Sequence, residues 1–103
     1  MADTHKRVSI GIELLSKSEE IKVMEDVKIF YDSKRKAMLL GKKDVNENLG
    51  DDIYFLVIHK LDPKGRIVIP STIRIAFPKA TYLPVMQNGR IYILIIEHNE
   101  KSE

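Results

Sequence analysis

The sequence predicts a small all-β domain, folded as a closed or mostly closed β-barrel with one or two short helical turns. Its 103 residues suffice for one domain with a single core. Apolar residues come in short runs rich in Val, Ile, Tyr and Phe, which are typical of strands. Several runs are almost entirely apolar, and an open sheet would leave a run such as IYILII with an exposed face or edge.

Strands are predicted over the apolar runs in chain order, at residues 8–15, 20–31, 36–40, 53–61, 66–69, 82–86 and 90–97. The pair Asn88-Gly89 between two runs is the strongest short-range hairpin signal. Segments 31–37 and 61–67 predict two further hairpin turns, in which Asp32 and Asp62 accept backbone hydrogen bonds.

Two connections between the predicted strands are longer, at residues 41–52 and 70–81. Pro70 is favourable in the first turn of a helix, and Pro78 disfavours helical backbone at Phe77. The second connection therefore has room for one or two helical turns.

Composition excludes several classes of function. Hydrophobic residues make up 44% and charged residues 31%, as in soluble globular proteins. The absence of cysteine excludes disulfides, thiolate metal sites and a cysteine nucleophile. The polar start lacks the apolar core of a signal peptide, and the longest apolar run is too short to span a bilayer. We therefore expect a cytoplasmic protein with no membrane partner.

Charge and the absence of recognisable site motifs narrow the possible classes of function further. The net charge of +2 permits an anionic partner without indicating one, so DNA binding must rest on local clusters. His5, His59 and His98 lack metal-ligand spacing, which predicts no metal site. The sequence has no Gly-rich phosphate loop and no evident acid–base pair, so we expect no cofactor and no enzymatic activity.

A faint internal repeat is present. Without gaps, Tyr31–Leu56 aligns with Leu61–Met86, placing Asp32 on Asp62. Turn, short strand, connection and strand then follow in the same order twice. The alignment predicts one domain over residues 1–103, with approximate halves 8–56 and 57–97 and polar tails 1–7 and 98–103. The alternative is that any two hairpins of a barrel look alike.

The segment LDPKGRIVIPSTIR, residues 61–74, carries the most specific pattern. Gly65 permits a positive φ in the turn. Strand alternation puts Ile67 and Ile69 on one face and Arg66 on the other. Pro70 lacks an N–H donor and closes the strand. On these grounds most of the segment specifies the fold.

This segment resembles the core motif of the AbrB-type DNA-binding domains, which include the MazE-like antitoxins and MraZ-like regulators. The matching residues are Asp62, Gly65, Arg66, Ile67, Ile69, Pro70 and Arg74. The similarity extends from Val57 to Glu97. The Gly-Asp pair that follows the family's short helix is here Ala80-Thr81. In the first half, Gly50-Asp51 stands at the aligned position, and Asp51 is expected to accept backbone amides there.

The resemblance implies a cradle-loop β-barrel of two related ββαβ-like halves that binds DNA and regulates transcription. Arg66 and Arg74 match arginines that contact DNA in the family, and guanidinium groups suit phosphates and guanine edges. Two further basic positions of the family fall on His59 and Ile75, which reduces the predicted surface. Other basic residues near the corresponding turns complete the predicted DNA-binding set: Lys64, Lys34, Arg35, Lys36, Lys42 and Lys43. The alternative for residues 33–36 is a solvated hairpin tip.

The resemblance also bears on assembly. Single-repeat AbrB-type chains complete each other by swapping hairpins between two subunits. A chain that holds both halves is expected to be a monomer, with a hairpin-swapped homodimer as the alternative. The alternative function is a monomeric cradle-loop barrel that binds a small ligand, a nucleotide or a protein partner without binding DNA, or an enzyme built on such a barrel.

Overall fold

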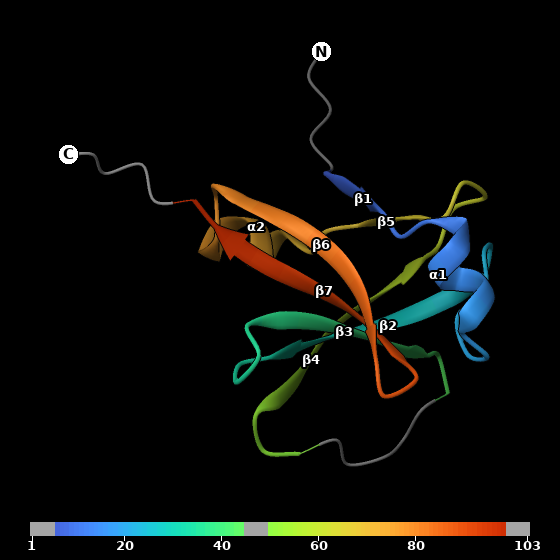
Figure 1. Cartoon of the computed structure of the whole chain (residues 1–103). Coiled ribbons are helices and arrows are strands. Elements are labelled where there is room, and N and C mark those ends of the chain that lie inside the picture. The colour runs from blue at the N-terminus through green and yellow to red at the C-terminus, as the bar shows by residue number, and fades with distance from the viewer. Residues whose placement is uncertain (1–5, 45–49, 99–103) are drawn as a thin grey trace.

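The computed structural model describes residues 6–44 and 50–98; His5 and most of both predicted tails lie outside these ranges. The described chain is mostly β, as predicted (Figure 1). Its elements are β1 (Arg7–Ser9), α1 (Ile12–Lys17), β2 (Asp26–Asp32), β3 (Ala37–Lys42), β4 (Ile53–Lys60), β5 (Arg66–Val68), α2 (Ser71–Ala76), β6 (Ala80–Gln87) and β7 (Arg90–Glu97).

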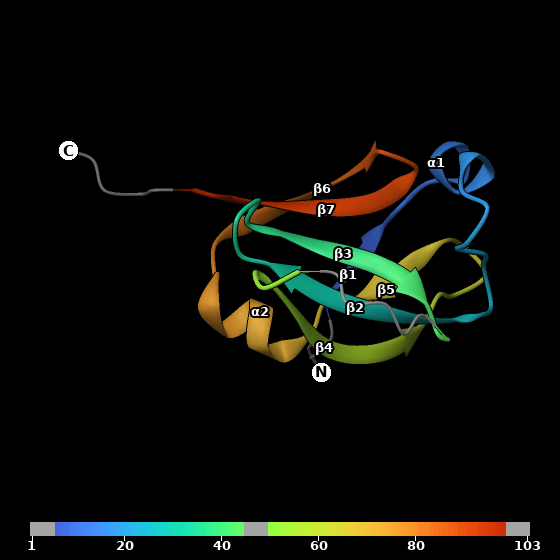
Figure 2. The same ribbon diagram turned by 90° about the horizontal axis from the view of Figure 1, so that it is seen from below.

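The strands form two antiparallel sheets. Five strands pair in the order β4-β2-β3-β7-β6, while β1 and β5 form a separate two-stranded ribbon. Figure 2 shows the five-stranded sheet curling in this order, with α1 and α2 near opposite ends of it. The main core joins the β1–β5 ribbon to the sheet. It contains buried residues from nearly every element: Val8, Ile10, Leu15, Ile21, Val27, Ile29, Met38, Leu40, Leu61, Ile67, Ile69, Ile73, Ile91, Ile93 and Ile95.

Several predictions of local structure are confirmed. Ile67 and Ile69 are buried, while Arg66 between the turn and Ile67 is only half-buried. The predicted helical turns are α2, which begins after Pro70. The last hairpin joins β6 to β7 through Asn88-Gly89, whose φ values of 52° and 77° are those of the tight turn that Asn-Gly favours.

The predicted strand over residues 8–15 is wrong. β1 ends at Ser9, Gly11 takes a φ of 97°, and α1 follows and buries Leu15. A short apolar run fits a strand or a buried helix equally well, because periodicity alone does not separate them. Arg7 also belongs to β1, although it was predicted to end the polar tail.

The predicted strand over residues 20–31 begins later, at Asp26. Before it, the Ser18 hydroxyl oxygen accepts the backbone N–H groups of Glu20 and Ile21, at 3.2 and 3.0 Å. Such local side-chain bonds compete with strand pairing, so the chain turns here and the strand starts after the turn.

The predicted turn at residues 61–67 is present, but the hairpin is not. The Gly65 N–H donates to the Asp62 carbonyl at 2.9 Å, which closes the turn. Beyond it β5 leaves β4 and pairs with β1 instead. Sequence reasoning assumes that strands adjacent in the chain pair with each other, which is a tendency and not a rule.

The chain repeats one order of elements. The N-terminal unit (residues 7–42) runs β1-α1-β2-β3, and the C-terminal unit (residues 66–97) runs β5-α2-β6-β7. Their contacts are reciprocal. The Ile10 N–H donates to the Gly65 carbonyl and the Ile69 N–H donates to the Lys6 carbonyl, both at 2.8 Å. The pairing of β1 with β5 is symmetric about one central residue pair, and so is the seam between β3 and β7.

These units differ from the halves 8–56 and 57–97 that the gap-free alignment predicted. That alignment superimposes β3 on β5, whereas in the structure β1 occupies the place equivalent to β5. It arose from similar turn chemistry, because the carboxylates of Asp32 and Asp62 both accept backbone N–H groups of the following residues. β4 belongs to neither unit and pairs with β2 at the edge of the sheet.

Candidate nucleic-acid interface

The outer face of the β1–β5 ribbon carries arginine from both strands. Val8 and Ile67 face each other at its centre and are buried in the core. Because side chains alternate along a strand, Arg7 and Arg66 lie on the opposite, outer face. The core therefore places no constraint on the chemistry of these two positions.

Lysines extend this basic surface. Lys6 precedes β1, is exposed, and has its Nζ 5.7 Å from the centre of the Tyr82 ring. Lys64 is exposed in the turn before β5. Arg7 is exposed, and no carboxylate of residues 6–44 or 50–98 forms an ion pair with it. We call Lys6, Arg7, Lys64 and Arg66 the basic ribbon.

Asp62 holds Arg66 in place. Its Oδ2 accepts Arg66 Nε at 2.8 Å, and its Oδ1 accepts the backbone N–H groups of Arg66 and Lys64, at 2.8 and 2.9 Å. A guanidinium has five N–H donors, so this contact orients Arg66 and occupies only one of them. The Arg66 side chain remains 43% exposed. The predicted role of Asp62 in the turn is confirmed.

These bonds lower the pKa of Asp62. The backbone N–H of Arg66 is the largest cause; the Arg66 guanidinium and the Lys64 N–H add to it, and desolvation opposes them. A carboxyl group with a lowered folded-state pKa stabilises the fold above its unfolded pKa, and this stability is lost as the pH falls through the folded value.

We therefore expect Asp62→Asn to weaken the acid dependence of stability. Urea unfolding of both proteins at pH 7 and at several values below pH 4 measures the effect. The wild-type protein should lose more of its unfolding free energy than the variant on acidification. Equal losses in the two proteins would contradict the assigned role of the Asp62 carboxylate.

Arg74 lies apart from the basic ribbon. Arg66 begins β5, whereas Arg74 is in the last turn of α2, beyond the other end of that strand (Figure 1). Arg74 is half-buried, with its Nε inaccessible to solvent. Desolvation raises the pKa of the nearby Tyr82, and the positive charge of Arg74 opposes that rise. Of the two predicted arginines, only Arg66 lies on the ribbon.

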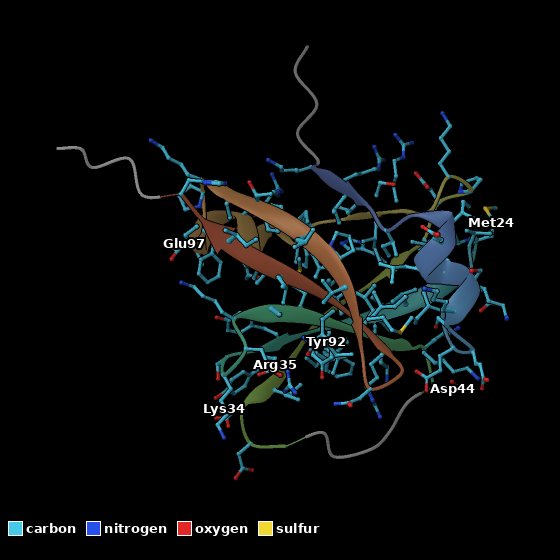
Figure 3. The ribbon with its side chains drawn as sticks, in the orientation of Figure 1. Met24, Lys34, Arg35, Asp44, Tyr92 and Glu97 are labelled. Atoms are coloured by element: carbon cyan, nitrogen blue, oxygen red, sulfur yellow. The ribbon has the colours of Figure 1, made fainter. Side chains whose placement is uncertain are left out.

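The basic residues of segment 33–36 engage neighbours in other elements. Lys34 lies 3.8 Å from Asp52, and Lys36 pairs with Glu97 at 2.5 Å. Figure 3 labels Lys34 at the turn between β2 and β3, away from the β1–β5 ribbon that Figure 1 labels. These lysines therefore help to fix this turn against the sheet.

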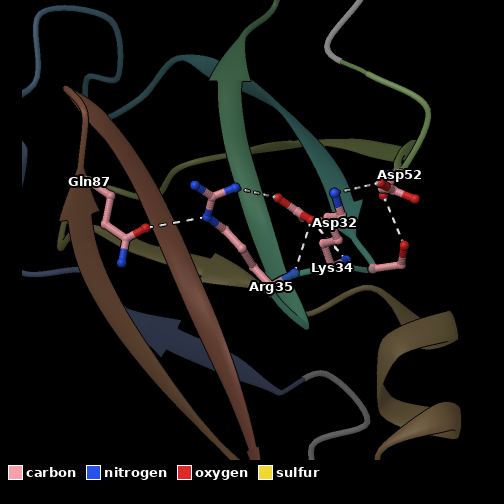
Figure 4. Close-up of polar contacts among 6 residues, drawn as sticks. Asp32, Lys34, Arg35, Asp52 and Gln87 are labelled. Carbon is pink, nitrogen blue, oxygen red and sulfur yellow. Dashed lines mark hydrogen bonds and ion pairs between the residues drawn. The ribbon is translucent and has the colours of Figure 1, made fainter.

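Arg35 joins the same turn to the far hairpin (Figure 4). Its Nη1 lies 3.3 Å from Oδ2 of the buried Asp32, and its Nε donates to Gln87 Oε1 at 3.4 Å. Its guanidinium carbon lies 5.1 Å from the centre of the Tyr92 ring. This arginine connects β2, β6 and β7, a structural task that explains its position.

The remaining predicted residues lie elsewhere. Lys42 and Lys43 line an open groove together with acidic residues, and Lys43 lies 3.8 Å from Asp26. Gly50 has a positive φ of 123°. The segment after it is tied to the end of β2 by the carbonyl of Asp52, which accepts the Ser33 N–H at 2.9 Å. The amide contacts expected of Asp51 stay a prediction.

Sequence reasoning missed Lys6 and Arg7. The signal was present, since Arg7-Val8-Ser9-Ile10 has the same pattern as Arg66-Ile67-Val68-Ile69. In both segments an arginine precedes two aliphatic residues at alternate positions. The gap-free alignment pairs the motif with residues 31–56 and does not include this match.

The described residues contain no helix long and apolar enough to cross a membrane. Within the same residues, no three His, Asp or Glu side chains are grouped so as to hold a metal ion. No family model, curated protein sequence or solved structure matches the chain.

Proposed function

We propose that this chain is a DNA-binding protein of AbrB-like type that acts in transcription regulation, and that it meets DNA through the basic ribbon. The observation that carries the proposal is the pair Arg7 and Arg66, presented on the outer face of one two-stranded ribbon. The major groove of B-form DNA admits a two-stranded β-ribbon. Guanidinium groups on such a ribbon suit phosphate oxygens and guanine edges.

The proposal extends to the fold. In a cradle-loop barrel of AbrB-like type, the N-terminal and C-terminal units would take the places of two single-repeat subunits. The reciprocal hydrogen bonds of Ile10 and Ile69 support this view. A single chain then supplies both arginines, which favours a monomer as the DNA-binding species. Sedimentation equilibrium at micromolar concentration distinguishes it from a hairpin-swapped dimer.

Salt dependence provides the direct test. Each phosphate that a cation neutralises releases counterions, and four such contacts by the basic ribbon predict a slope of about −3.6 in a plot of log affinity against log salt concentration. Fluorescence anisotropy with a labelled 20-base-pair duplex measures this slope. Absence of binding at low salt, where non-specific attraction is strongest, would overturn the proposal.

A matched variant controls for net charge. Lys34→Ala/Lys42→Ala removes two positive charges outside the basic ribbon, and Lys6→Ala/Lys64→Ala removes two within it. We expect only the second pair to reduce the slope, by about 1.8. Equal reductions would show that binding follows total charge and has no particular face.

A further inference from the structure

The two units differ at one edge of the five-stranded sheet. In the N-terminal unit, β2 carries β4 along its outer edge. The equivalent edge in the C-terminal unit belongs to β6, which ends the sheet. The pairing of β3 with β7 shows which residues of the two units are equivalent, because Met38 pairs with Ile93 at its centre. Their partners in the adjacent strands, Tyr31 and Pro84, therefore occupy equivalent positions.

A groove lies where the counterpart of β4 would lie. It has a volume of about 400 Å³ and is lined by Lys6–Ser9 from β1 and its approach and by Ala80–Tyr82 from β6. The next residue of β6, Leu83, is 46% exposed. Its equivalent in β2 is Phe30, which packs against Phe55 of β4 with ring centres 5.7 Å apart. A strand beside β6 would cover Leu83 in the same way.

Pro84 limits the length of such a strand. Proline has no N–H to donate, and in sheets it is found at edges, where that position faces away from the ladder. The pairing edge of β6 is therefore residues 80–83, which includes the part that lines the groove. A strand added to this edge gains main-chain hydrogen bonds, as in other cases of β-strand addition.

Charge specifies the chemistry of the added strand. β4, which lies along β2 of the N-terminal unit, is followed by Asp62, and the carboxylate of Asp62 binds Arg66 of the C-terminal unit. Arg7 is the equivalent of Arg66, and no described carboxylate pairs with it. The exposed Lys6 adds a second positive charge beside it. A strand with an acidic residue in the position of Asp62 would pair with Arg7.

We propose that this groove binds an extended segment of a partner protein, in which alternating apolar residues are followed by Asp or Glu. The segment pairs antiparallel to β6 at residues 80–83, and its carboxylate accepts hydrogen bonds from the Arg7 guanidinium. The inference stands independently of DNA binding, although a bound segment would compete with nucleic acid for Arg7.

The test uses a peptide that copies residues 53–64 of this chain, IYFLVIHKLDPK, acetylated and amidated at its ends. We expect saturable binding by fluorescence anisotropy, with amide chemical-shift changes in the full-length protein at residues 6–9 and 80–83. Changes confined to β2 would mean that the peptide replaces β4, and would overturn the proposal, as would absence of binding.

A double-mutant cycle tests the carboxylate contact. Asn in place of the Asp62 equivalent in the peptide should weaken binding to the wild-type protein about tenfold, as expected for loss of a charge-assisted hydrogen bond. Arg7→Ala should weaken binding of the original peptide to a similar degree, and the two changes together should cost no more than either alone. Lys22→Ala, an exposed lysine outside the groove, should have no effect. Additive losses would overturn the assignment of Arg7 as the partner.

Discussion

The double variant Arg7→Ala/Arg66→Ala is expected to lose most of the affinity of this protein for duplex DNA. If each arginine contributes about 1–3 kcal/mol, the double variant should bind at least about 30-fold more weakly at the same salt concentration. The effect should be large because both side chains lie on one face and meet the same duplex. Anisotropy titrations at two salt concentrations measure the loss.

Two controls make this result specific. Arg35→Ala removes an arginine that connects β2, β6 and β7. This variant should be less stable than wild type, while its folded form should keep most of its affinity for DNA. Thermal melts of the double variant should stay close to wild type, since Arg7 is exposed and Arg66 loses only its contact with Asp62. If Arg7→Ala alone leaves affinity unchanged, the face of the β1–β5 ribbon is not the DNA-binding surface.

Gly65→Val is expected to cause a large loss of stability. Gly65 has a φ of 79°, and a β-branched residue in this region is strained. A Cβ at this position would lie 3.0 Å from Leu15 Cδ1, so the side chain also crowds the core beneath α1. Backbone strain and overpacking together should lower the unfolding free energy by about 3 kcal/mol.

Gly89→Val is the matched comparison. Gly89 has nearly the same φ, 77°, but a Cβ there meets no atom within 4 Å. Its substitution should cost only the backbone strain, about 1–2 kcal/mol. Urea unfolding of both variants gives the difference. Equal losses would show that Leu15 moves aside at no cost, and that the turn is not packed tightly against α1.

The sequence predicted elements whose determinants are local. The Asn88-Gly89 turn, the alternation of Ile67 and Ile69 and the helix after Pro70 all follow from residues within a few positions of one another. The pairing of β5 with β1 does not follow from such local residues. A three-residue strand carries too little pattern to specify its neighbour, so the reciprocal bonds of Ile10 and Ile69 could be found only in three dimensions.

The candidate site shows the same division. Asp62, Gly65 and Arg66 form one local turn, in which the backbone bonds to Asp62 and the positive φ of Gly65 are as predicted. The contact between the Asp62 carboxylate and the Arg66 guanidinium was not predicted. Arg7 reaches the same surface only because β1 pairs with β5. Conversely, the gap-free alignment places Lys36 on Arg66, but Lys36 lies in another turn and pairs with Glu97.

The pairing of distant strands also has a kinetic consequence. The pairing of β1 with β5 and that of β3 with β7 each join residues more than 50 positions apart in the sequence, such as Arg7 with Val68 and Ala37 with Leu94. Neither unit can complete its core alone, because Val8 and Ile67 bury each other. Most of the chain must be ordered before these contacts repay the entropy of loop closure. A high contact order follows, and domains of this kind fold on the scale of milliseconds to seconds. During synthesis on a ribosome, β1 emerges before β5, so the N-terminal unit would leave the exit tunnel before its partner strand is present.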